Sequence, residues 1–275
     1  MNPFSALAGT IPEPAMQAYV VLMFILVVAG TLLDVAHKKS AKYFAKLTEE
    51  QKRLAKRDVS SQKAGIAIGV VANEVLTSSE FSNPKRRLSH LLTMYGFVFL
   101  VLSTAVLIFG YGTSEGGGFW GLLWHLGALM LVAGSYWFWF GIRVDVFAEG
   151  HPVTDIKQRD IFILGLMSMG TFALLWSIFR GVGGLNWLFF VLFIVSATVL
   201  FSTVLWSKFA HMFFKPAAAF QKKTAWADGS REKLPDIPDL SSAEVHQKFP
   251  DIPKYMGDRP GNMGLGIKRE RPNHY

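Results

Sequence analysis

The sequence predicts an all-α integral membrane bundle of five transmembrane helices. The chain has 275 residues, of which 51% are hydrophobic, yet its net charge is +8. Its apolar residues gather in runs of about 20, the length at which a helix rising about 1.5 Å per residue crosses a hydrocarbon core of about 30 Å. The basic residues lie between those runs. Apolar blocks separated by basic segments are typical of a multi-pass membrane protein.

Five apolar runs are long enough to span, and we expect helices at about 15–36, 88–109, 119–142, 161–179 and 187–214. A further apolar stretch, 64–76, is too short to cross and is expected to lie at the interface or to face a partner. The chain then divides into an N-terminal segment with the first helix (1–37), a basic segment (38–87), a four-helix membrane region (88–214) and a tail (215–275).

The distribution of Lys and Arg predicts the orientation in the membrane. All 28 basic residues except Arg180 lie in the segment 38–87, in the loop 143–160 or after position 207. Because positive charges are retained in the cytoplasm during insertion, we expect the N-terminus outside and the basic segments inside. The expected location is the cytoplasmic (inner) membrane. This placement of the charges favours topology over nucleic-acid binding as the reason for the basic composition.

The tail, 215–275, is expected to be an extended cytoplasmic arm. It has no long apolar period, it repeats PDIP at 235–238 and 250–253, and its prolines fix φ and withhold N–H groups. Such an arm is either disordered or wrapped around a partner. We favour a partner because the arm carries more apolar anchors than a solvating tail needs. These anchors are Ile237, Phe249, Ile252, Tyr255, Met256 and Leu265.

The chain has no cysteine. It therefore cannot form disulfides, bind zinc through cysteine or hold an iron–sulfur cluster by itself, so any cluster must sit on a partner. The sequence also lacks a Ser-His-Asp pattern, a zinc signature and a nucleotide-binding signature.

Two histidines supply the candidate chemistry. His90 opens the second expected span, and His211 lies near the end of the fifth, in LWSKFAHMFFKP (205–216). Both are expected at the cytoplasmic ends of antiparallel helices, where each can offer one imidazole to opposite faces of a haem b iron. Two histidine ligands fill both axial positions and favour electron transfer over oxygen binding. The alternative is two interfacial histidines bonded to headgroups or backbone carbonyls.

Other residues near the helix ends complete the expected site. Three basic neighbours are expected to pair with the haem propionates: Arg86, Arg87 and Lys208. Three ionisable residues are candidates for contacting a quinone or passing a proton: Asp34, His37 and His125. A snorkelling side chain is the alternative for His37, and a hydrogen bond across helices is the alternative for His125.

The segments RRLSHLLTMYGF (86–97) and WSKFAHMFFKP (206–216) resemble the cytochrome b membrane subunits of the nitrate reductase gamma and heterodisulfide reductase membrane-subunit superfamily. The resemblance covers about residues 88–220. In that family the second and fifth helices usually carry two histidines each and hold two haems b. The positions that match the second pair are Leu100 and Phe193 here, so the resemblance implies one haem, held by His90 and His211.

The basic segment, the single histidine pair and PDIPKYMGDRP (250–260) most resemble the membrane anchor of adenylylsulfate reductase. That resemblance implies a non-catalytic or quinone-reactive subunit. Its cytoplasmic flavin and iron–sulfur partner would interconvert sulfite plus AMP with adenosine 5'-phosphosulfate and exchange electrons with quinone. One alternative is a haem-free structural anchor that only recruits a soluble enzyme. A small transporter is disfavoured because charges in the spans are confined to helix ends and no span is broken by proline.

Overall fold

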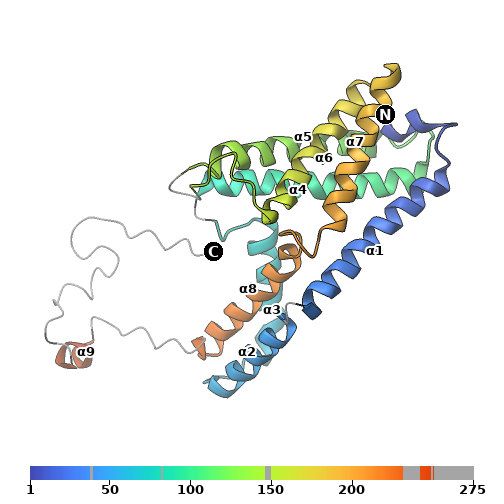
Figure 1. Cartoon of the computed structure of the whole chain (residues 1–275). Coiled ribbons are helices and arrows are strands. Elements are labelled where there is room, and N and C mark those ends of the chain that lie inside the picture. The colour runs from blue at the N-terminus through green and yellow to red at the C-terminus, as the bar shows by residue number, and fades with distance from the viewer. Residues whose placement is uncertain (38–39, 82, 146–149, 232–241, 249, 251–275) are drawn as a thin grey trace. The chain divides into compact units, whose positions relative to one another are not determined.

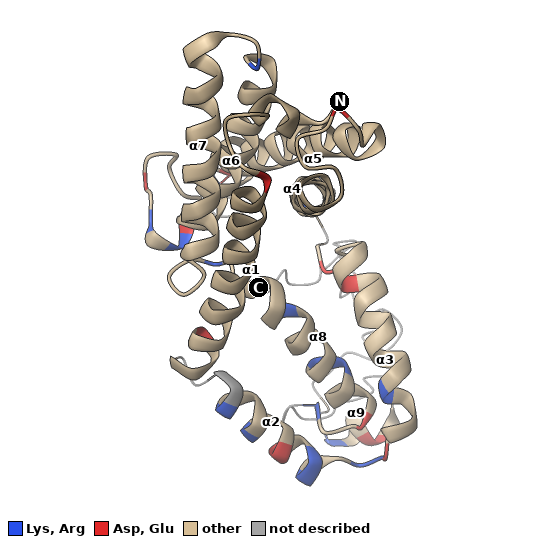
Figure 2. Cartoon of the chain, turned by 90° about the vertical axis from the view of Figure 1, so that its right-hand side faces the viewer, with Lys and Arg blue, Asp and Glu red and all other residues tan. Residues whose placement is uncertain are grey.

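The computed structural model describes every residue except 38–39, 82, 146–149, 232–241, 249 and 251–275, and every regular element in that described part is a helix. Five helices are long and apolar enough to cross a membrane, so the chain is a multi-pass membrane protein of the predicted fold class. These spans are Glu13–His37, Pro84–Tyr111, Gly118–Ile142, Gln158–Ile178 and Gly183–Ser202. Charged residues are few along them and gather on the other helices and the loops (Figure 2).

The elements follow one another as Figure 1 shows. The α-helices are α1 (Glu13–His37), α2 (Ser40–Leu54), α3 (Lys63–Gly69), α4 (Pro84–Val106), α5 (Gly118–Trp137), α6 (Ile161–Ile178), α7 (Gly183–Ser202), α8 (His211–Ala227) and α9 (Ala243–Lys248). Three π-helical segments continue α3, α4 and α5: Val70–Leu76, Leu107–Tyr111 and Phe138–Ile142. Three short 3-10 helices complete the order: Pro3–Leu7, Ser60–Gln62 and Gln158–Asp160.

The chain divides into two compact units, Met1–Lys46 with Ala67–Phe220, and Leu47–Ile66 with Gln221–Tyr275. In the first unit, α4 packs along α5, α5 along α6, α6 along α7, and α1 against α7 (Figure 1). From α4 to α7, helices that follow one another are therefore neighbours, as their short connections favour, whereas α1 packs against the last span.

Glycines bring the backbones of α4 and α5 into direct contact. A methyl group added at Gly96 would lie 2.4 Å from the backbone nitrogen of Leu131, and one at Gly127 would lie 2.6 Å from that of Leu100. At Gly134 it would lie 2.5 Å from the nitrogen of Thr93. Small residues at an interface let helices approach closely in lipid, where dispersion replaces the hydrophobic effect as the driving force. The three glycines therefore fix the register of this pair.

The last span ends earlier than the sequence predicts. We expected one helix over 187–214, but α7 stops at Ser202, and turns occupy 203–210 before α8 begins at His211. Local bonds favour the turn over further helix: the Thr203 hydroxyl donates to the Val199 carbonyl at 2.7 Å, and the Ser207 hydroxyl accepts from the Phe209 amide at 3.2 Å. Because α7 already has 20 residues, it can cross a core of about 30 Å without the turn.

The structure also corrects the expected start of the extended tail. Residues 215–227, predicted as part of an extended arm, belong to α8, and α9 lies further along. The apolar anchors from Ile237 to Leu265 and most of both PDIP repeats lie outside the described residues, as do Lys38 and Lys39.

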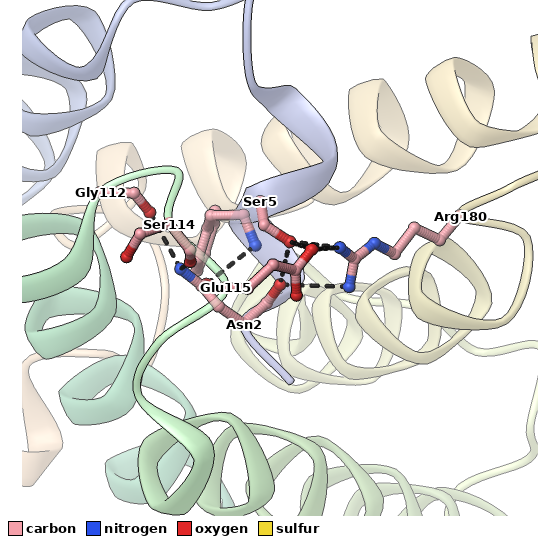
Figure 3. A network of polar contacts seen from close by, with 7 residues as sticks. Asn2, Ser5, Gly112, Ser114, Glu115 and Arg180 are labelled. Atoms are coloured by element: carbon pink, nitrogen blue, oxygen red, sulfur yellow. Dashed lines mark hydrogen bonds and ion pairs between the residues drawn. The ribbon is translucent and has the colours of Figure 1, made fainter.

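A polar network closes one end of the α4–α7 bundle (Figure 3). The Asn2 side-chain amide donates to the carbonyls of Gly112 and Ser114, both at 2.9 Å. Arg180 donates to the Asn2 carbonyl at 3.2 Å and to Glu115 at 3.1 Å, and it also contacts the Ser5 hydroxyl. Arg180, the lone basic residue of its side in the predicted topology, is thus neutralised within this network. We call this the Asn2 end of the bundle.

The second unit is organised around Asp228, which follows α8 directly. Its carbonyl accepts from the backbone amides of Lys56 at 2.8 Å and Arg57 at 3.1 Å. Its carboxylate accepts from the Gln51 amide at 2.6 Å and from the Ser230 backbone amide at 2.8 Å. Burial raises the pKa of Asp228, but the bonds from Ser230 and Gln51 outweigh burial, so the pKa lies below its ordinary value.

We predict that Gly96→Ala destabilises the bundle by about 1–3 kcal/mol, the usual range for overpacking, because the α4 and α5 backbones must separate. Thermal unfolding of the detergent-solubilised chain measures this effect. Gly110→Ala is the matched control, since a methyl group there meets nothing within 4 Å. Equal stability of the two variants would contradict a direct backbone contact.

We predict that the second unit weakens in acid. A carboxylate with a lowered folded-state pKa stabilises above its unfolded pKa of about 3.9, and this contribution is lost as pH falls through the folded value. The protection factors of the Lys56 and Arg57 amides against exchange should therefore fall in that range. Asp228→Asn should lower this protection already at pH 7, because the free energy of opening the unit falls by about 1.5–3 kcal/mol. Glu49→Gln should leave it unchanged. Exchange rates unaffected by Asp228→Asn would refute this role.

Candidate functional site

His90 lies in the second turn of α4, which begins earlier than predicted. The Asn83 side chain caps the helix by accepting from the amides of Lys85 at 2.9 Å and Arg86 at 3.3 Å, and Pro84 occupies the first turn. The neighbouring residue Ser89 donates to the carbonyl of Gly134 on α5 at 2.9 Å. The position of His90 therefore depends directly on the close α4–α5 contact.

A buried serine holds the His90 ring. The Ser78 hydroxyl lies 3.0 Å from His90 Nδ1. Ser78 is fully buried, and its φ of 48° is in the left-handed region that side chains other than glycine disfavour. Strained residues of this kind persist where the surrounding structure determines them, often at functional sites. Phe81 lies on the same segment as Ser78, and the centre of its ring is 5.0 Å from that of the His90 ring.

His211 is the first residue of α8 and is positioned by the turn that precedes it. Phe209 in that turn is buried against Phe97 of α4 and Phe162 of α6, with ring centroids at 6.2 and 5.4 Å. The Phe162 ring also packs edge-on against His211 at 5.4 Å. His211 Nδ1 donates to the carbonyl of Lys208. The end of α7 and the start of α8 therefore hold this imidazole in place.

The start of α8, which carries His211, meets the segment that leads to His90, and we call this region the His90 end of the bundle. His90 lies within electrostatic range of His211 and Lys215. Lys215, one helical turn after His211 on the same face of α8, pairs with Glu80 at 2.7 Å, and its Nζ lies 5.1 Å from the centre of the Phe81 ring. The start of α8 thus meets the segment that leads into α4.

The two imidazoles are held in the same way, through Nδ1. Each ring uses Nδ1 for a hydrogen bond, and within the described part of the chain Nε2 of neither has a hydrogen-bond partner. Because the Lys208 carbonyl can only accept, the proton of neutral His211 sits on Nδ1 and the lone pair on Nε2. Burial lowers the pKa of His211, outweighing the Lys208 bond, and the charges of Lys215 and Lys208 lower it further. The lowered pKa favours the neutral imidazole, which is the form that an iron ligand must have.

The three residues predicted to pair with haem propionates differ in their contacts. Arg86 lies 5.6 Å from the Phe81 ring centre, and its charge reaches His90. Arg87 Nε donates to the Thr77 carbonyl at 2.7 Å, so this side chain fixes the loop before α4. Lys208 is exposed, although its charge reaches His211.

The predicted quinone candidates are not brought together with one another in a single cluster. Asp34 is buried near the end of α1, whereas His37 is exposed. His125 lies toward the Asn2 end, with Nδ1 2.6 Å from the Gly121 carbonyl and Nε2 2.6 Å from the Ser177 hydroxyl of α6. The structure therefore shows the hydrogen bond across helices that was the alternative for His125.

Apolar packing fills the positions where the resemblance would place a second histidine pair. Leu100 is 1% exposed, and Phe193 is buried, with its ring stacked on Trp176 at 6.0 Å and edge-on to Trp124 at 6.1 Å. Phe4, from the N-terminal segment, packs against both tryptophans. This part of the bundle is an aromatic core.

Sequence reasoning missed four residues of the site: Ser78, Glu80, Phe81 and Lys215. One signal was readable, because Lys215 follows His211 by four residues and so shares its helix face. The other three precede α4 in a polar loop, where no periodicity indicates which side chain turns toward the helix.

Comparison of the chain with protein-family models, curated proteins and solved structures finds no match. The function is therefore inferred from the geometry of this site together with the sequence.

We predict that His125 and Ser177 are energetically coupled. Interhelical hydrogen bonds in membranes contribute about 0.6 kcal/mol on average. A double-mutant cycle of His125→Ala and Ser177→Ala, measured by unfolding in detergent, should give a coupling energy of about that size. A coupling energy of zero would contradict the bond.

Proposed function

We propose that this chain is the membrane anchor and electron-transfer subunit of an oxidoreductase complex, with His90 and His211 as axial ligands of one haem b. The observation that carries the proposal is that two imidazoles, each held by a hydrogen bond at Nδ1, lie where the start of α8 meets the segment before α4. A haem with two imidazole ligands supplies a one-electron carrier with no open position for oxygen.

The surroundings of the pair support this assignment. The Ser78 hydroxyl and the Lys208 carbonyl orient the rings through Nδ1, as outer-shell partners of metal-bound histidines do. The rings of Phe81 and Phe162 pack against the imidazoles and limit the access of water. Basic side chains beside the rings provide partners for propionates.

The proposed partner is a cytoplasmic flavin and iron–sulfur oxidoreductase, adenylylsulfate reductase by resemblance. The basic segments support the docking of an acidic surface: Lys52, Arg53, Lys56, Arg57 and Lys63 are exposed in the second unit. By the distribution of basic residues these segments face the cytoplasm, with the chain in the cytoplasmic membrane. The second electron partner is a quinone from the bilayer, for which Asp34 and His37 are the proposed contacts. His125 ranks behind them because both its nitrogens are bonded.

We predict that His90→Ala and His211→Ala each abolish the haem b absorbance of the purified chain without preventing membrane insertion. The loss follows because one imidazole alone leaves an axial position unfilled. A dithionite-reduced minus oxidised spectrum and a pyridine haemochrome assay measure haem per chain, and one haem per wild-type chain is expected. His246→Ala, on α9, is the matched control and should retain the haem.

An unchanged spectrum in either variant would refute the ligand assignment. If the wild-type chain is folded, is produced with sufficient haem and contains none, the function is that of a haem-free anchor.

A further inference from the structure

The His90 end carries a surplus of positive charge. The segments 77–90 and 205–216 together hold five cationic side chains and one carboxylate, Glu80. The first turns of α4 and α8 both lie here, and the N-terminus of a helix adds partial positive charge of its own. A site of this kind favours an anionic ligand group.

Lys215 lies where its ammonium group can bind an anionic ligand group. It follows His211 by one helical turn on the same face of α8, and its Nζ lies 5.1 Å from the ring of Phe81, which packs against His90. Its side chain is 40% exposed, whereas that of Glu80 is 16% exposed. The ammonium group is therefore reachable while its acidic partner is mostly covered.

Two contacts aim the Lys215 side chain. Glu80 accepts from Nζ at 2.7 Å, and the face of Phe81 lies 5.1 Å from the same atom. The Phe81 ring also contacts His90, at 5.0 Å. The lysine is thus held beside the histidine pair by the segment that precedes α4.

We propose that Lys215 binds a propionate carboxylate of the haem held by His90 and His211, and that Glu80 is the residue that positions its ammonium group. This proposal rests on the proposed function. It places Lys215 ahead of Arg87 as a carboxylate partner, because Arg87 Nε donates to the Thr77 carbonyl. Arg86, 5.6 Å from the centre of the same Phe81 ring, is a second cationic partner.

The test compares two ligands that differ only in their carboxylates. The full-length chain in detergent, stripped of haem, is titrated with haem and with haem dimethyl ester. We expect the wild-type chain to bind the free acid at least about tenfold tighter, and Lys215→Gln to reduce that ratio at least about fivefold by loss of one charge-assisted bond. Lys222→Gln, an exposed lysine on the same helix, should leave the ratio unchanged, and Lys215→Arg should restore it.

A second measurement tests Glu80 and Lys215 together. Because oxidised haem carries one more positive charge, Lys215→Gln should lower the haem midpoint potential and Glu80→Gln should raise it. Glu80→Asp should lie near the wild type. If the midpoint potential shifts in the same direction in Lys215→Gln and Glu80→Gln, the proposal that Glu80 positions the Lys215 ammonium group is overturned.

The outcomes separate the two proposals. If the wild-type chain binds both haem forms equally, or if Lys215→Gln leaves the ratio intact, the carboxylate assignment is overturned and the histidine ligands stand. If neither form binds to folded wild-type chain, the haem assignment itself fails and this inference fails with it. Loss of bound phosphatidylglycerol from Lys215→Gln with an unchanged ratio would assign Lys215 to a lipid phosphate instead.

Discussion

The direct backbone contact between α4 and α5 is the constraint on which the candidate site depends. Lipid tails are as apolar as the helices they surround, so two spans associate only where their surfaces meet closely or share hydrogen bonds. Gly96, Gly127 and Gly134 provide the close surface, and the Ser89–Gly134 bond adds a polar anchor. Since His90 follows Ser89 in sequence, a shift of this interface by one turn would remove the imidazole from the site.

The position of His211 depends on a different feature, the interruption of the helix after Ser202. Had α7 continued to residue 214, His211 would belong to the same rigid rod as the last span. The turn at 203–210 instead lets Val204 and Phe209 pack into the core, and α8 begins as a separate helix at His211. A methyl group at Gly30 of α1 would meet Val204 at 2.8 Å, so the turn is also packed against the first span. Contacts of this turn with α1, α4 and α6 therefore position His211, although His211 itself lies outside every span.

The spans were predictable because the hydrocarbon core demands length and low polarity, and both are readable in sequence. The interruption after Ser202 was not, because Val204, Leu205 and Trp206 keep the run apolar while the turn depends on local hydroxyl bonds. Of the site, the places of His90 and His211 near the ends of apolar runs were readable in sequence, and their role as haem ligands stays a prediction. The Glu80–Lys215 pair was not readable, since it joins positions 135 residues apart. The Ser177 partner of His125 likewise depends on how α5 and α6 pack.

The network at the Asn2 end also constrains how the chain is threaded through the bilayer. It joins the segment before α1, the turn between α4 and α5 and the connection between α6 and α7. Direct hydrogen bonds cannot reach across a hydrocarbon layer of about 30 Å, so these three connections emerge on one side. An even number of crossings must therefore separate each from the next, which pairs α1 with α4 and α5 with α6. This parity rule is independent of the basic residues and leaves only the direction of insertion for them to decide.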